Sequence, residues 1–326
     1  EAVEALLAGQ VLVQRSGEGR AWLVDVRGFK HRLPDEPDLE PSIRGPREGL
    51  IEVLDVNVAA IRRRLATPWL RFEQLELGPL TRTRAAILYV AGRADPLVVA
   101  TVRERLRAAD RWDAVTSTQQ LQELLEPRVG SLFPQVRQTE RPDVCVAALA
   151  EGRIIVLLDG TPFALIVPLS FWDLLQSPDD YHLRWPFGVT LRLLRLALLL
   201  MLAVLPVYLA VVTFHPELIP TAFFLSLASA REGLPFPTLV EALVMSFLFD
   251  LLREASTRLP KQIGGALTVV GALVIGEAAV RGGFVSAPMV ILIGLSALSA
   301  FVLPAFETTI PFRILSYLLV GLAGTL

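Results

Sequence analysis

A change in composition near Arg184 most constrains what this chain can fold into. The residues before it carry most of the Arg, Asp and Glu side chains, whereas long apolar runs dominate after it. The chain is 53% hydrophobic with a mean hydropathy of +0.51, which is too apolar for an ordinary soluble protein. The pattern predicts an α/β cytosolic region of two small subdomains, followed by an all-α, multi-span membrane domain.

The composition and the local patterns place the domain boundaries. We expect an N-terminal α/β subdomain over residues 1–68 with a linker helix over 46–65, a second α/β subdomain over 69–183, and a transmembrane domain over 184–326. Glu1 is not a natural start and Leu326 falls inside an apolar run, so both ends look like truncations.

Alternating and helical periodicities predict the elements of the first part. The runs QVLVQ (10–14) and AWLVDV (21–26), separated by SGEG, are typical of a hairpin. A second hairpin is expected around Asp159-Gly160, because this pair accepts the positive φ of a tight turn. Further predictions are strands at 70–77 and 85–90 and helices at 96–109, 118–126 and from an N-cap at Thr139 to about Glu151.

The predicted helix over 46–65 ends in three consecutive arginines, Arg62, Arg63 and Arg64. Cations suit the negative end of a helix dipole. The helix is interpreted either as a contact helix, binding another protomer or phospholipid headgroups, or as a solvated linker between two subdomains, which is the more usual environment of a charge run.

The chain contains no recognisable catalytic, cofactor or metal motif. Phosphate-loop, zinc-protease and nucleophile-elbow spacings are absent, and His31, His182 and His215 are far apart. Cys145 is the single cysteine and lies in an apolar run, which predicts a buried structural thiol. The net charge of −2 argues against a nucleic-acid partner. We therefore expect neither an enzyme nor a bound cofactor.

About five membrane crossings are predicted after Arg184. Residues 187–214 form the first, with a kink at Leu205-Pro206, and Arg184, Arg192 and Arg195 place its start on the cytosolic side. The second is a pair of short helices, 221–230 and 238–252, interrupted by REGLPFP (231–237). The interruption favours a pore or transport path, with an interfacial amphipathic helix as the alternative. Residues 264–280, 284–303 and an incomplete 314–326 provide the rest.

Small residues recur at four-residue steps on the crossing over 264–280. They are Gly264, Thr268, Ala272 and Gly276. A shared small face lets another helix approach closely, so this face is predicted to pack against a neighbouring helix.

Ionisable residues within the apolar part are candidates for an ion path or gate, because charges at membrane depth are costly. They are Glu241, Asp250, Arg253, Glu254, Arg258 and Glu277. Asp250 with Arg253, Glu254 with Arg258, and Glu277 with Arg281 have spacings that allow pairing within one helix. The alternative is a ring of charges at a channel mouth in an oligomer. The strongest candidate position is the REGLPFP segment beside Glu241.

Several phrases resemble the GerA family of spore germination proteins, the A subunits of germinant receptors and their SpoVAF-type paralogues. They are GPREG with the following RRR, TERPD (139–143), DGTPFALIVP (159–168), DDY (179–181), PFP (235–237), LLREA (251–255), RLP (258–260) and VVGALVIGEAAV (269–280).

The resemblance implies a multi-pass protein of the spore inner membrane, with its soluble region on the core side. It also implies a homo-oligomer that releases ions to trigger germination, together with a transporter-like B subunit, a lipoprotein C subunit and membrane lipid as partners. The alternative function is a non-conducting scaffold that clusters receptor subunits.

Overall fold

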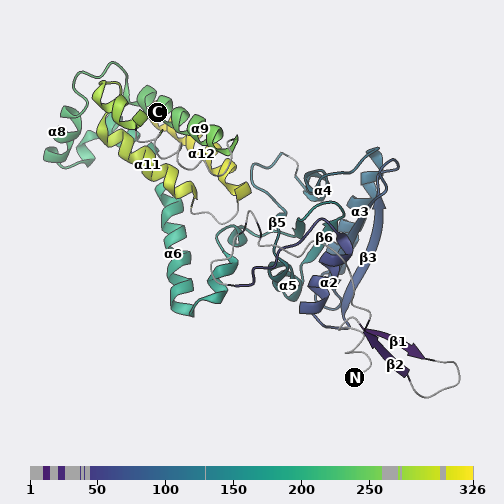
Figure 1. Ribbon diagram of the computed structural model, residues 1–326. Helices are drawn as coiled ribbons and strands as arrows, with labels where there is room; N and C mark the ends of the chain where they lie inside the picture. Colours follow the sequence, from purple (N-terminus) through teal and green to yellow (C-terminus); the bar gives the residue numbers. More distant parts are fainter. Residues whose placement is uncertain are drawn as a thin grey trace. The chain divides into compact units, whose positions relative to one another are not determined.

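The structure is a computed structural model that describes residues 10–14, 21–25, 37, 40, 45–128, 130–258, 271, 274–301 and 306–325. The chain divides into two compact units. The first contains residues 1–173 and 177–184, and the second contains 174–176 and 185–326. Figure 1 traces both units along the sequence.

The first unit holds a five-stranded antiparallel sheet in the order β3-β4-β6-β7-β5. Its strands are β3 (Leu70–Leu77), β4 (Thr83–Val90), β5 (Arg137–Thr139), β6 (Ile154–Leu158) and β7 (Ala164–Val167). A separate hairpin pairs β1 (Gln10–Gln14) with β2 (Ala21–Asp25), as predicted. The predicted SGEG turn lies outside the described residues.

Helices cover both faces of the five-stranded sheet (Figure 1). One face packs against α3 (Pro96–Arg107), η1 (Ala108–Arg111) and α4 (Thr118–Leu125). The other packs against α2 (Leu54–Arg64) and α5 (Pro142–Ala150). Alternation along β4 explains the two cores, since Ala85 and Ile87 lie on the α3 side whereas Ala86 and Leu88 lie on the α2 side.

The helix predicted over 46–65 is shorter, and it is not a linker. Helix α2 begins only at Leu54, and its Leu54 and Ile61 side chains are buried in the same core as strand residues of the sheet. Residues 46–53 are not helical because their backbone groups bond elsewhere. Leu50 N donates to Glu140 O, and Gly160 N donates to Glu52 O. The predicted boundary at 68 therefore cuts through one packed unit.

Asp159 connects the β6–β7 turn to two other elements. Its Oδ1 accepts the backbone N–H of Leu54 at 3.0 Å, at the start of α2, and its Oδ2 accepts both Nε and Nη2 of Arg84 on β4. The connection is longer than the predicted tight turn, with Leu157 opposite Ala164. Asp159 N and Gly160 N bond to Arg84 O and Glu52 O rather than closing a two-residue turn.

Two further predictions concern α5. Its N-cap is Arg141 rather than Thr139, because Thr139 ends strand β5, which the sequence did not predict. Thr139 Oγ1 nevertheless accepts the backbone N–H of Arg141. The buried, free thiol of Cys145 on the same helix confirms the structural thiol, and burial raises its pKa.

The second unit is helical. The helices whose bounds are described include α6 (Trp185–Met201), α7 (Val204–Phe214), η4 (Pro216–Leu218), α8 (Thr221–Ser229), α9 (Thr238–Arg258), α11 (Ala287–Phe301) and α12 (Phe306–Thr325). Their apolar core contains Leu205, Leu209, Met245, Met289 and Val320. The 3₁₀ helices η2 (Phe171–Leu174) and η3 (Pro178–His182) come directly before α6 in sequence.

The apolar helices of this unit differ in length. The stretch from Trp185 to Phe214 is long and apolar enough to cross a membrane, whereas the apolar helices Ala287–Ser299 and Thr309–Thr325 are shorter. The break between α6 and α7 fits the kink predicted at Pro206, since a proline cannot donate to the carbonyl four residues before it. The interruption between α8 and α9 is confirmed. Five crossings stay a prediction.

Replacing Asp159 with Ala is expected to destabilise the first unit by about 1–2 kcal/mol, because α2 loses the side-chain acceptor at its first turn and Arg84 loses a partner. Amide hydrogen exchange on the full chain should accelerate at residues 54–57. The exposed Asp110→Ala variant is the control. Unchanged exchange at the start of α2 in Asp159→Ala would contradict this role.

Candidate functional site

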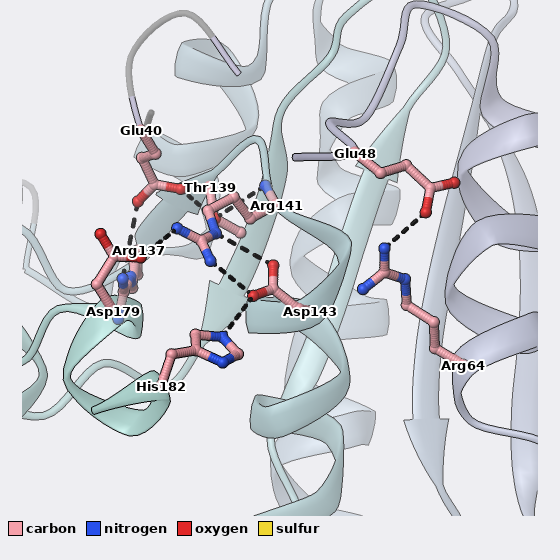
Figure 2. Close-up of polar contacts among 9 residues, drawn as sticks. All are labelled: Glu40, Glu48, Arg64, Arg137, Thr139, Arg141, Asp143, Asp179 and His182. Carbon is pink, nitrogen blue, oxygen red and sulfur yellow. Dashed lines mark hydrogen bonds and ion pairs between the residues drawn. The ribbon is translucent and has the colours of Figure 1, made fainter. Parts of the chain in front are cut away.

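A polar network in the first unit centres on Arg141, whose side chain is 2% exposed. Its Nε and Nη2 donate to the two oxygens of Asp143 at 3.1 and 2.8 Å, and its Nη1 donates to Asp179 Oδ1 at 3.2 Å. Figure 2 shows the guanidinium between the two carboxylates. Because Asp143 lies in the first turn of α5 and Asp179 lies in η3, the network fixes η3 to α5.

The network extends on both sides of Arg141 (Figure 2). His182 Nε2 lies 3.8 Å from Asp143 Oδ2. Thr139 Oγ1 donates to Glu40 Oε2, and Arg137 Nη2 lies 3.7 Å from Glu40 Oε1. Two phrases that resemble the germination family, TERPD and DDY, are therefore brought together in space. Their separation of more than 35 residues concealed this contact from sequence reasoning.

Arg141 and Asp143 stabilise each other's charged forms. Burial acts to raise the pKa of Asp143, but hydrogen bonds and Coulombic attraction from Arg141 hold it below its ordinary value. Burial acts to lower the pKa of Arg141, and Asp143 and Asp179 outweigh it, so that pKa is raised. Arg141 therefore forms a buried salt bridge with Asp143 and Asp179. No cluster of metal-ligating side chains occurs among the described residues.

Glu48 forms ion pairs with two arginines of the run at the end of α2. Glu48 Oε1 accepts Arg63 Nη2 at 2.5 Å, and Glu48 Oε2 accepts Arg64 Nη2 at 2.6 Å. The Arg64 pair is drawn in Figure 2. Two of the three arginines thus bind within the unit. The contact-helix hypothesis would have to rest on Arg62 and on the exposed side chain of Arg63.

In the second unit, Glu241 is buried at the first turn of α9, with a side chain that is 0% exposed. Its Oε1 accepts the N–H and Oγ–H of Ser286, the residue before α11. Its Oε2 lies 3.7 Å from Nε of Arg231, which belongs to the REGLPFP segment. The carboxylate therefore joins the interrupted segment, α9 and the positive N-terminal end of α11.

Asp250 lies farther along α9 and binds α12. Its Oδ2 accepts the hydroxyl of Tyr317 at 2.7 Å, and its Oδ1 accepts Arg313 Nη1 at 3.3 Å. Arg253 is within electrostatic range of Asp250 and of Arg313. The within-helix spacing predicted the attraction between Asp250 and Arg253 but missed both α12 partners, which lie more than 60 residues away.

The remaining predicted site residues are placed as follows. Glu277 Oε1 and Arg281 Nη2 form an exposed ion pair at 2.6 Å, which confirms that predicted pairing. Glu254 is exposed near the end of α9, and the side chain of Arg258 lies outside the described residues. Gly276 is buried, and a Cβ there would lie 3.6 Å from Val290 of α11. Gly264, Thr268 and Ala272 lie outside the described residues.

These features define an α/β unit followed in sequence by an apolar helical unit with a buried carboxylate, Glu241. Over residues 1–326 the chain matches the family described as Bacillus/Clostridium GerA spore germination protein. The chain belongs to this family, as the resemblance predicted.

Relatives with known sequences support the assignment. The chain is 40% identical over 321 residues to the uncharacterized membrane protein YfkQ of Bacillus subtilis, covering 98% of this chain and 62% of that protein. It is 40% identical to spore germination protein KA of Bacillus subtilis, covering 97% and 58%, and 40% identical to spore germination protein GerLA of Bacillus cereus, covering 99% and 65%. The chain thus spans about three fifths of the length of these relatives.

A solved structure also matches. It is the N-terminal domain of the A subunit of the Bacillus megaterium spore germinant receptor GerK3, with 30% identity and a TM-score of 0.38 over 52% of this chain and 60% of that chain.

Replacing Arg141 with Met is expected to lower the stability of the full chain by about 3–5 kcal/mol, because Asp143 and Asp179 lose a buried counter-ion. The exposed Arg71→Met variant is the control and should change stability by about 0.5 kcal/mol or less. Thermal unfolding measures both. Equal effects of the two substitutions would show that the network contributes nothing specific.

The lowered pKa of Asp143 also predicts a pH dependence. Folding is favoured by this group above the pKa of an unfolded Asp, about 3.9, and that contribution is lost as pH falls through the lower folded pKa. Acidification below about pH 5 should therefore destabilise the parent chain more than Asp143→Asn, relative to their stabilities at pH 7. An identical pH profile of the two proteins would refute the linkage.

Proposed function

We propose that this chain is an integral membrane subunit of a spore germination complex that oligomerises and forms an ion-release channel. Family membership and the names of the relatives support the role in germination. The apolar stretch from Trp185 to Phe214 supports insertion into a membrane. The proposed location is the spore inner membrane, with the first unit on the core side and with B and C subunits as partners.

One observation carries the channel proposal. Glu241, a fully buried carboxylate in an apolar helical unit, lies beside the interrupted segment between α8 and α9. Ionisable groups in such surroundings are costly to keep and are usually functional. Irregular backbone at membrane depth is tolerated only when it is buried in protein or lines a water-filled cavity. An ion path next to this segment would account for both the buried carboxylate and the irregular backbone.

A scaffold that clusters receptor subunits is the second candidate, and a different observation favours it. Glu241 and Asp250 both have partners on other segments, Ser286 and Arg231 for the first and Tyr317 and Arg313 for the second. A carboxylate that is bonded to another segment can hold helices together without contacting any permeant ion. Of the two oxygens of Glu241, Oε1 accepts hydrogen bonds from Ser286, whereas the buried Oε2 accepts none and has only the ion pair with Arg231.

Ion flux into liposomes distinguishes the two functions. The full-length protein, with and without its proposed partners, is expected to conduct cations. The Glu241→Gln and Asp250→Asn variants should change the rate or the ion selectivity severalfold while keeping the oligomeric state. Glu277→Gln is the matched control, because its carboxylate is exposed and paired only with Arg281 in the contacts described above.

Two results would reject the channel. One is an absence of flux in every oligomeric form, and the other is parent-like flux in both Glu241→Gln and Asp250→Asn. Normal assembly of these variants without conduction in the parent protein would instead support the scaffold. Light scattering in detergent reports the oligomeric state in each case.

A further inference from the structure

The second unit contains three buried polar atoms whose hydrogen-bonding capacity is unused. Tyr208 Oη, Arg231 Nε and Glu241 Oε2 are buried and have no hydrogen-bond partner among the residues that the structure describes. The three residues belong to α7, to the REGLPFP segment and to the first turn of α9. A buried polar atom without a partner costs free energy, so the three atoms indicate a site that binds something other than protein.

These three residues are neighbours in space. Arg231 Nε lies 3.7 Å from Glu241 Oε2, which is beyond the range of a direct N–H···O hydrogen bond. Tyr208 lies within electrostatic range of both Arg231 and Glu241. A single oxygen atom can lie about 2.9 Å from both Nε and Oε2, so a small molecule can bridge the gap between them.

The described protein groups around the site do not provide the missing hydrogen bonds. Ser286 uses both its N–H and its Oγ–H on the other oxygen of Glu241, Oε1. Leu209 and Ala242, which follow Tyr208 and Glu241 in the chain, are fully buried apolar residues. Oε2 therefore needs a donor from another source, and Arg231 Nε needs an acceptor.

The chemistry of the three atoms defines the ligand. Arg Nε–H only donates, an ionised carboxylate oxygen only accepts, and a Tyr hydroxyl does either. The ligand must therefore both donate and accept. The charges of Arg231 and Glu241 cancel, so a cation at the site would be repelled by the guanidinium and an anion by the carboxylate. A neutral molecule avoids both, and the burial of all three atoms favours the smallest one, water.

We propose that Tyr208, Arg231 and Glu241 bind one ordered water molecule. The water accepts the Nε–H of Arg231, donates to Oε2 of Glu241 and forms a third hydrogen bond with the Tyr208 hydroxyl. About three hydrogen bonds are usual for a buried water in a protein. The water separates the carboxylate from the guanidinium and links α7 to the interrupted segment. This site holds water rather than the permeant cation of the proposed channel, and it does not depend on whether the chain conducts.

Crystallography of the full-length protein in lipid, at a resolution that shows ordered waters, tests the site directly. Crystals grown in K⁺ are compared with crystals grown in Rb⁺, because the anomalous scattering of Rb⁺ marks a bound cation. We expect a peak of water density within about 2.6–3.2 Å of all three atoms, without an anomalous signal in Rb⁺.

Three results would overturn the water site. An anomalous Rb⁺ peak would show that the site binds a cation. A direct hydrogen bond between Arg231 and Glu241, with no density between them and Tyr208, would show that the ion pair closes by itself. A direct hydrogen bond from the Tyr208 hydroxyl to Oε2 would show that protein satisfies the carboxylate.

Removal of one hydroxyl gives an independent test by stability. If Tyr208 binds the water, Tyr208→Phe loses a hydrogen bond and should lower the midpoint of thermal unfolding by a few degrees. If its hydroxyl is buried without a partner, the same substitution should leave the midpoint unchanged or raise it. Tyr317→Phe is the matched control in the same unit, because the Tyr317 hydroxyl donates to Asp250 at 2.7 Å and its loss should lower the midpoint. An unchanged or raised midpoint in Tyr208→Phe would overturn the proposal.

Discussion

The buried guanidinium of Arg141 is the interaction on which the end of the first unit depends. Arg141 is the N-cap of α5 and binds two carboxylates, one from the first turn of α5 and one from η3. Removing a charge of this kind from water is costly, and only close, multiply bonded partners repay that cost. Because η3 ends only a few residues before α6, the position of the chain where it leaves the sheet unit is determined by this salt bridge.

Local patterns in the sequence predicted much of the first unit. Strand β3 falls at the predicted residues, and β4, α3, α4 and the hairpin β1–β2 differ by a few residues at their ends. These elements are determined by periodicity and by turn residues close to them in the chain. Strand β5 was missed because three residues give no periodicity, and it forms only through pairing with β7.

Long-range contacts explain where the predictions differed from the structure. The apolar spacing over 46–65 suggested one helix, but Leu50 and Ile51 are buried in a non-helical segment. Its backbone N–H groups donate to Glu140 O and to the Asn57 side chain. Sequence spacing also missed the long-range contacts of the candidate site. Spacing within a helix identified Glu277 with Arg281, whereas Arg141 with Asp179 and Asp250 with Tyr317 join residues that no local rule connects.

The partners of the buried Glu241 carboxylate limit how any channel through the second unit could work. A cation approaching Glu241 would have to displace either the two hydrogen bonds that Ser286 donates to Oε1 or the Arg231 guanidinium, whose Nε lies 3.7 Å from Oε2. Conduction past Glu241 therefore needs a second conformation in which Glu241 and Arg231 separate. A partner or ligand would increase the population of that conformation by binding it more tightly. Otherwise the path must be lined by backbone carbonyls of the interrupted segment, with Glu241 holding that segment in place. Each route gives Glu241 a different role, so the effect of neutralising it separates gating from permeation.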